Sequence, residues 1–543
     1  MKKELGKTFS LEELNQNPTI VKQAAILDRQ EESVLRGNDA RSEPIREGPP
    51  RLSDLVHARG KQAAFDDVRR QTERKLDALG LSWDKDVEEV LPIYDFLQFW
   101  RATTDSIIFR IVFACAKATT KQLRSAMETV LSKHEMLRTI LVDSALAGPS
   151  WVMIRSSSHW FDLAIKDGGI LDRPEDLLTT DLSYRDAMGS MDSKPIPLFY
   201  ITIYYIETIK SAGFVVYGDH STYDAHSVLS IFIEDLGKAL NNPVATLPSR
   251  PRYSLFANAY YNHRTSVPAQ LNLEYFTSRV KGIAQRRGGL WPLESFQSVN
   301  GSPARTADQL LLKGNITPGL AGIANHIRID MSNNQYLKVH KIPHVVAIKA
   351  AIAIFNTQQT GHPYAFFSNL QMCRTYPFIE SQIADRLPDP MDMPGATIET
   401  SFDNIYLDPT EPISTLLHRM QVEQTENTAR AQYPSLRLRD QLGDEDGDFL
   451  HEVLRRQAIN YNPVVTPDPN ATLQNLQFAG HANLSFMWWC GMVDAETVQM
   501  RVTWNDEVLG LKDAEMAMNG FERNMKWLVN GDNWDKTIEE CAH

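Results

Sequence analysis

The sequence is poor in the residues that build cross-linked or metal-bound scaffolds. Its four cysteines, Cys115, Cys373, Cys490 and Cys541, lie far apart and form no Cys-x-x-Cys pair. We therefore expect neither a disulfide framework nor a metal site, and this cysteine usage fits a reducing compartment.

Long apolar runs and long basic runs are also missing. No window reaches the roughly 18 consecutive apolar residues that a membrane span needs. The N-terminal stretch MKKELGKTFSLEELNQNP lacks the apolar core of a secretory leader. Lys and Arg number 56 against 68 Asp and Glu, a net charge of -12, with no basic cluster typical of a nucleic-acid binder. These absences predict a cytoplasmic protein with neither nucleic acid nor membrane as a partner.

Length and hydrophobic patterning indicate two lobes. A chain of 543 residues with 43% hydrophobic residues is too long for one ordinary core. Branched and aromatic residues predict a strand at 106–116, helical spacing predicts a helix over 119–137, and 137–143 returns to strand. A second passage of alternating helices and strands begins near residue 270. This alternation favours a two-lobed α/β architecture.

The first 85 residues differ in character from the rest. Residues 1–28 carry a capping box, with Ser10 followed by Glu13, and predict a pair of helices. Residues 29–60 are polar and interrupted by prolines, which is typical of a linker. We expect residues 61–85 to form a helix that leads into the main body.

The most informative segment is GFVVYGDHSTYDAHSVLSIFIEDL, residues 213–236. An apolar strand passes into a polar loop, and a long amphipathic helix follows. Loops held on such a scaffold commonly carry catalytic groups. Within this loop only His220 has an ordinary pKa near neutrality, so it is the candidate general base for an amine or hydroxyl attacking a carbonyl. On the spacing alone, an ordinary loop histidine is the more common interpretation.

Asp224 is a weaker candidate for proton transfer because an aspartate is ionised and weakly basic at pH 7. Its expected roles are structural. It can cap the helix that follows, or it can form one half of a buried ion pair.

Five segments together resemble the condensation domains of nonribosomal peptide synthetases, in the order in which that family has them. The core motif of the family, His-His-x-x-x-Asp-Gly, corresponds here to Asp219, His220, Asp224 and Ala225. The other four segments are Leu91 to Gln98 (LPIYDFLQ), Lys133 to Thr139 (KHEMLRT), Arg374 after a strand, and Ile459 to Pro463 (INYNP). Such a set is more specific than any one of its members.

The resemblance implies a fold and a set of roles. The fold is a V-shaped pair of lobes, each similar to chloramphenicol acetyltransferase, with the active site in a tunnel between them. His220 corresponds to the functional histidine of the family. Arg138 corresponds to an arginine that we expect to form a buried salt bridge with Asp224 and so to hold the loop; the alternative for Arg138 is a solvated cation at a helix end.

The sequence departs from the family pattern in ways that bear on activity. Asp219 replaces the first histidine and Ala225 replaces the glycine. Fungal terminal condensation-like domains, which release and often cyclise a peptide, usually have Ser-His there, so Asp219 is unusual even among them. Beside His220, the Asp219 charge would raise the histidine pKa, or its side chain would point to solvent. Phe276 stands where the family has tryptophan, and the Asp-Phe-Gly-Trp-Gly motif of plant-type CoA-dependent acyltransferases is missing.

The N-terminal segment resembles the last two helices of a peptidyl carrier domain, through Asn17-Pro18-Thr19, although a generic helical hairpin is the alternative. The resulting division is a carrier remnant at 1–28, a linker and lead-in helix at 29–85, an N-lobe at 86–265 and a C-lobe at 266–543.

The resemblance implies acyl transfer from a thioester to an amine or hydroxyl, with amide, ester or ring formation. The donor would arrive on the phosphopantetheine arm of a carrier protein, and no directly bound cofactor or metal is expected. Two alternatives stay open: a free-standing acyltransferase that uses acyl-CoA, and a condensation-like domain that only docks carriers.

Overall fold

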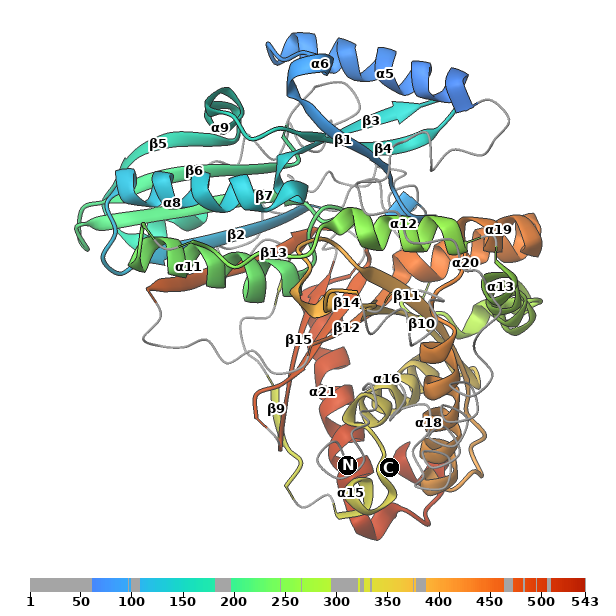
Figure 1. Ribbon diagram of the computed structural model, residues 1–543. Helices are drawn as coiled ribbons and strands as arrows, with labels where there is room; N and C mark the ends of the chain where they lie inside the picture. Colours follow the sequence, from blue (N-terminus) through green and yellow to red (C-terminus); the bar gives the residue numbers. More distant parts are fainter. Residues whose placement is uncertain are drawn as a thin grey trace, which may run out of the picture.

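Two lobes of mixed helices and strands lie one above the other in the structure (Figure 1). The computed structural model describes residues 61–95, 97–98, 108–180, 197–244, 246–264, 266–293, 321–322, 327–332, 335–374, 376, 387–462, 472–481, 484–494, 496–504 and 509–542. The predicted carrier-like segment 1–28 and the linker at 29–60 lie outside these residues. No helix in the described part of the chain combines the length and apolar character that a bilayer crossing requires.

The N-lobe is built on a five-stranded sheet with the strand order β13-β2-β7-β6-β5. Its bounds are β2 Ile108–Cys115, β5 Ile165–Leu171, β6 Phe199–Ile206, β7 Ser211–Asp219 and β13 Leu473–His481. Strand β7 is buried along its whole length and pairs with β2 and β6. The predicted strand at 106–116 is β2, and the apolar run that precedes the His220 loop is β7.

Helices cover this sheet, and hydrophobic spacing predicted the one at 119–137. They are α8 Thr120–Lys133, α9 Ser158–Ala164 and α11 Ile233–Asn241, whereas α12 Tyr253–His263 packs on the strand Val87–Pro92. Helix α8 begins at a capping box in which Thr119 accepts from the Gln122 backbone N–H and Gln122 accepts in return. The apolar stripe from Leu123 to Leu131 is buried, which anchors α8 on the sheet.

A smaller sheet, β1-β4-β3, lies beside the first and carries the lead-in helices. Its strands are β1 Val87–Pro92, β3 Thr139–Ser144 and β4 Gly148–Ile154, and the helices are α5 Lys61–Ala78 and α6 Trp83–Asp86. Val68 and Leu76 of α5 are fully buried in the N-lobe core. The Ser144 hydroxyl donates to Asp67 at 2.6 Å. The predicted helix at 61–85 therefore exists, and it is a packed part of the lobe.

The C-lobe is built on a seven-stranded sheet with the order β11-β10-β12-β14-β15-β8, and β9 also pairs with β15. Its strands are β8 Ala321–Gly322, β9 Ile327–Asp330, β10 Tyr364–Met372, β11 Ile398–Tyr406, β12 Gln457–Asn462, β14 Phe486–Met492 and β15 Thr497–Trp504. The helices are α13 Val267–Val280, α15 Gln335–His340, α16 His344–Thr360, α18 Ile413–Ala429, α19 Ser435–Leu442, α20 Asp444–Arg456 and α21 Leu511–Val529. Helices α16 and α21 pack together against one face of the sheet in a second core.

One strand crosses from the C-terminal part of the sequence into the N-lobe. Strand β13 pairs antiparallel with β2, from Leu473 opposite Cys115 to His481 opposite Ile108. A single cut after residue 265 therefore does not separate the two lobes completely, because residues 473–481 belong to the N-lobe sheet.

Candidate active site

His220 lies directly after β7, where that strand leaves the N-lobe sheet. The strand ends at Asp219, which is in register with Ile108 at the start of β2. The Phe109 ring stands edge-on to the His220 imidazole, with the ring centroids 5.9 Å apart. Gly218 makes this contact possible, because a Cβ at that position would lie 2.2 Å from the Phe109 ring. The loop thus begins from a rigid and tightly packed strand end.

The surroundings of His220 favour its neutral form. Burial lowers the pKa of the imidazole below its usual range of about 6.5. The backbone of His220 and Tyr223 and the charges of Asp224 and Asp219 act in the opposite direction, and burial outweighs them. An unprotonated imidazole at pH 7 is the form that accepts a proton.

Asp219 does not point to solvent. Its side chain is buried, and the Oδ1 atom accepts from the backbone N–H of Ser221 at 2.8 Å. Its backbone carbonyl accepts from the Thr222 hydroxyl at 2.8 Å. The residue that replaces the first histidine of the family motif therefore shapes the loop, and its charge raises the pKa of His220.

Replacing Asp219 with asparagine separates these two effects. Asparagine keeps an oxygen for the Ser221 N–H and removes the charge that raises the pKa of His220. We expect the acid limb of the kcat/KM profile of Asp219→Asn to move to lower pH, because His220 then stays unprotonated further into the acid range. A pH profile measured beside Asp143→Asn, an exposed carboxylate on β3, checks this. A limb that stays in place, or moves to higher pH, contradicts it.

Asp224 is held by a dense set of donors at the other end of the loop. Arg374 Nη2 donates to its two oxygens at 2.7 and 2.9 Å. The Ser227 N–H donates to Oδ1 at 2.8 Å, and the N–H and hydroxyl of Thr397 donate to Oδ2 at 3.1 and 3.2 Å. Burial raises the pKa of Asp224, but the Arg374 charge and these hydrogen bonds outweigh it and hold the pKa below its usual range. Both structural roles expected for Asp224, helix cap and buried ion pair, are present.

The expected partner of Asp224 was wrong. Arg138 lies at the end of the short 3-10 helix η1 (Glu135–Arg138) that follows α8. Its guanidinium donates to Glu88 at 2.7 Å and to the backbone carbonyls of Leu131 and Ile154 at 2.7 and 2.8 Å. These acceptors come from the end of α8 and from β1 and β4, so they hold Arg138 within the N-lobe. The alternative, a solvated cation, does not apply either, because Arg138 is buried.

Arg374 instead brings the C-lobe to the loop. It follows β10, and its Nη1 atom donates to the carbonyl of Met393 at 2.5 Å. Nearby, the Ala396 N–H donates to the Thr222 carbonyl at 3.1 Å. The Tyr94 hydroxyl donates to the Ile398 carbonyl at 2.7 Å. The loop that carries His220 is therefore fixed by both lobes.

A buried chain of hydrogen bonds supports the same loop from the N-lobe. The Tyr223 hydroxyl lies 2.5 Å from His134 Nδ1, and His134 Nε2 lies 2.9 Å from Asp235. Burial lowers the pKa of His134 despite Asp235, so the ring is neutral. Because a carboxylate can only accept, Nε2 carries the proton and Nδ1 accepts from Tyr223. Arg250 completes the chain by donating to Asp235 at 2.8 Å.

The helix after the loop opens with a π-helical turn, η3 (Ser227–Phe232), before it continues as α11. Such turns are frequent at functional sites. Ala225, which replaces the family glycine, is half-buried at the start of this helix.

Comparison with solved structures identifies the fold. The first condensation domain of the CDA synthetase aligns with a TM-score of 0.57 and 12% identity, over 83% of this chain and 98% of that chain. The condensation domain of the Monacolin K polyketide synthase MokA aligns with a TM-score of 0.58 and 11% identity, over 84% of this chain and all of that chain. The chain has the condensation-domain fold. A structure described as a CT mutant aligns similarly, with a TM-score of 0.57 and 13% identity, over 83% of this chain and 92% of that chain.

The likeness lies in structure, because no protein-family model and no curated protein matches the sequence. The condensation-domain fold is the two-lobed, chloramphenicol-acetyltransferase-like fold expected from the motifs. At 11–13% identity, these neighbours establish the fold of the chain.

Two further segments of the motif set belong to the C-lobe. Ile459 to Asn462 form most of β12, between β10 and β14 in the C-lobe sheet, and Pro463 lies outside the described residues. Phe276 is buried on α13, where it stacks on Tyr433 with the centroids 4.4 Å apart. These segments build the C-lobe. Within the described residues, no group of His, Cys, Asp or Glu is arranged to hold a metal ion.

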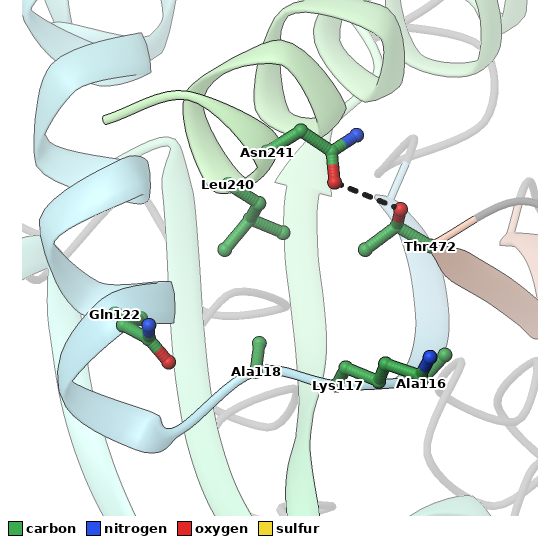
Figure 2. A pocket seen from close by; sticks show the side chains of 7 residues that line it. All are labelled: Ala116, Lys117, Ala118, Gln122, Leu240, Asn241 and Thr472. Atoms are coloured by element: carbon green, nitrogen blue, oxygen red, sulfur yellow. Dashed lines mark hydrogen bonds between the residues drawn. The ribbon is translucent and has the colours of Figure 1, made fainter. Parts of the chain in front are cut away.

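A cavity of about 220 Å³ lies at the opposite end of the N-lobe sheet (Figure 2). Its lining includes Lys117, Gln122, Leu240, Asn241 and Thr472, and the Thr472 hydroxyl donates to Asn241 at 3.2 Å. The cavity lies at the end of β2, next to its last residue, whereas His220 lies beside the first residue of β2. The eight residues of β2 separate the two places by roughly 25 Å, so this cavity does not adjoin His220.

Removing the Tyr223 hydroxyl tests the chain of hydrogen bonds behind the loop. Tyr223→Phe keeps the ring but leaves the buried Nδ1 atom of His134 without its donor. We expect the free energy of unfolding to fall by about 1–3 kcal/mol. Chemical denaturation beside Tyr275→Phe, whose hydroxyl bonds to Asn427 in a half-buried position, is the measurement. Equal losses in both variants would show that the Tyr223 hydroxyl has no special role.

Proposed function

We propose that this protein catalyses acyl transfer from a thioester on the phosphopantetheine arm of a carrier protein to an amine or hydroxyl. The observation that carries the proposal is the placement of His220. Its neutral imidazole lies on a loop that an interlobe ion pair, Asp224 with Arg374, holds between the lobes of a condensation fold. Its catalytic role, and the supporting roles of Asp224 and Arg374, are part of the proposal.

The reaction mainly requires alignment of the donor with the acceptor and the transfer of one proton. The acceptor nitrogen or oxygen attacks the thioester carbonyl carbon, and His220 takes the proton from the acceptor. The tetrahedral intermediate collapses, the C–S bond breaks, and the thiol leaves with that proton. Because a thioester is already activated, positioning of the two substrates supplies much of the rate.

The neighbours support this class of reaction. Two of them are condensation domains of the calcium-dependent antibiotic synthetase and of a polyketide synthase, and another structure of the first contains a substrate analogue. We infer from this fold that the partner is a carrier protein and that the products are amides or esters. Mass spectrometry of the products distinguishes a ring, which forms when the acceptor belongs to the same peptide, from a linear product.

Kinetics with two forms of one donor test the proposal. The same acyl group is presented on a holo-carrier protein and on CoA, with one amine acceptor, and product is measured by mass spectrometry. We expect a clear preference for the carrier in kcat/KM. A preference for the CoA ester would favour the free-standing acyl-CoA enzyme, and no product from either donor would favour a domain that only docks carriers.

A further inference from the structure

Arg501 is a cation that no carboxylate of the described residues pairs with. It lies on β15, directly opposite Trp489 of β14. Its guanidinium carbon sits 5.0 Å from the centre of the Trp489 ring. Neither a hydrogen bond nor a carboxylate reaches this guanidinium from the described residues. Arg501 is nevertheless half-buried, and burial lowers its pKa.

Three other buried cations among the described residues are each paired with a carboxylate. Arg374 contacts Asp224, Lys349 contacts Asp403 at 2.8 Å, and Arg250 contacts Asp235. A cation removed from water without an anion is unfavourable. Stacking on tryptophan offsets part of that cost, but it uses only the flat face of the guanidinium. The N–H groups at the edge of Arg501 find no acceptor in the part of the chain that the structure describes.

Strand register places Arg501 on the sheet face that lies opposite helices α16 and α21. Leu370, Asn460, Trp489 and Arg501 are successive cross-strand partners on β10, β12, β14 and β15. The neighbours of Arg501 along β15, Met500 and Val502, point the other way into the C-lobe core. Arg501 and Trp489 therefore belong to the face that these helices do not cover.

This face leads to the proposed active site. Leu370 packs both against the N-lobe core and against the small cluster that includes Trp489. Four residues further along the chain, Arg374 contacts Asp224 in the catalytic loop. Three strand spacings separate β10 from β15 in the sheet order, which is roughly 14 Å. A substrate that extends from His220 along this face would bring a distal group to Arg501.

We propose that Arg501, stacked on Trp489, binds an oxyanion carried by a substrate. Arginine offers a planar fork of donors that suits a carboxylate or a phosphate ester. That a substrate reaches Arg501 from His220 rests on the proposed acyl transfer. In that reaction, two substrates carry an oxyanion. One is the phosphate ester of the pantetheine-linked donor, and the other is a carboxylate on the acceptor.

Direct binding tests the site without requiring turnover. Titration calorimetry of the full chain at low ionic strength compares phosphopantetheine with pantetheine, and an amino acid with its amide. In each pair only the first compound carries the additional oxyanion. We expect the parent to prefer the anionic member of one pair, and that pair identifies the source. This preference should weaken as salt is added.

The variants locate the effect at Arg501. We expect Arg501→Met, which keeps the length of the side chain, to weaken binding of the preferred anion by about 10-fold to 100-fold. Binding of the neutral analogue should stay unchanged. Arg328→Met, on the adjacent strand β9 and exposed, is the matched control and should bind like the parent.

Two outcomes overturn the proposal: equal affinity of the parent for the charged and neutral members of both pairs, or equal anion binding by Arg501→Met and the parent. If Arg501→Met does not fold, anion binding by Arg501→Lys and the salt dependence of anion binding by the parent test the proposal in its place. Failure here leaves acyl transfer by His220 untouched, because no step of that reaction enters the measurement.

Discussion

Arg374→Ala is expected to lower the free energy of unfolding by about 3–5 kcal/mol, the cost of leaving a buried charge unpaired. Asp224 would keep the hydrogen bonds from Ser227 and Thr397 but lose the cation that holds its pKa down. The two lobes would also lose the guanidinium that joins the His220 loop to the Met393 carbonyl. Chemical denaturation of the parent and the variant measures the effect.

A double-mutant cycle distinguishes the ion pair of Arg374 with Asp224 from the expected pair of Arg138 with Asp224. Arg374→Ala and Asp224→Ala should couple by about 0.5–3 kcal/mol because the two side chains are in contact. The matched cycle of Arg138→Ala with Asp224→Ala should show almost no coupling, because Arg138 pairs with Glu88. The reverse pattern would mean that Asp224 pairs with Arg138 in solution.

The same pair predicts a pH dependence. The pKa of Asp224 lies below its usual value in the folded state, so its share of the stability is present above about pH 4 and is lost as the pH falls through the folded-state pKa. In Arg374→Ala this share is already missing. The difference in unfolding free energy between parent and variant should therefore shrink as the pH falls below about 4.

His220→Ala is expected to lower kcat/KM for acyl transfer by about 100-fold to 10,000-fold, the usual contribution of a general base. Substrate alignment between the lobes would remain, so residual transfer above the uncatalysed rate is also expected. The melting temperature should stay close to that of the parent, because the loop is held by Asp219, Tyr223 and Asp224. His220→Gln, which keeps a polar side chain without a basic nitrogen, should be similarly slow.

Much of the fold follows from local sequence patterns. The alternation of apolar residues predicts β2 and β7, and the spacing of apolar residues in 119–137 predicts α8. Strand β13 is different, because LQNLQFAGH has a mixed pattern and its partner β2 lies more than 350 residues away. Nothing local indicates that this strand leaves its own lobe.

The segment that carries His220 was predicted correctly as a loop between an apolar strand and a helix, and its contacts were predicted less well. Asp224 and Arg374 are 150 residues apart, and they meet only because the end of β10 docks on the loop. Arg138 was the expected partner because of a motif match, and a motif match does not show where a side chain points in the folded protein. The 2.7 Å contact of Arg138 with Glu88 depends on where α8 ends relative to β1.

The pairing of Tyr223 with His134 and the stacking of Arg501 on Trp489 were not predicted. Both depend on the packing of elements that are distant in sequence or on strand register. A histidine next to a glutamate at 134–135 gives a motif signal, but only the fold shows that its ring reaches Tyr223 at 2.5 Å.

The measurement that tests the central claim most directly is single-turnover transfer, followed by mass spectrometry. The parent and His220→Ala are each mixed in excess with one peptidyl-pantetheine thioester and one amine, near pH 7. We predict that the parent forms the amide at least about 100-fold faster than the variant. Equal rates in the two proteins, at equal melting temperatures, would mean that the amide forms without His220, and the assignment of this loop as the catalytic centre would be wrong.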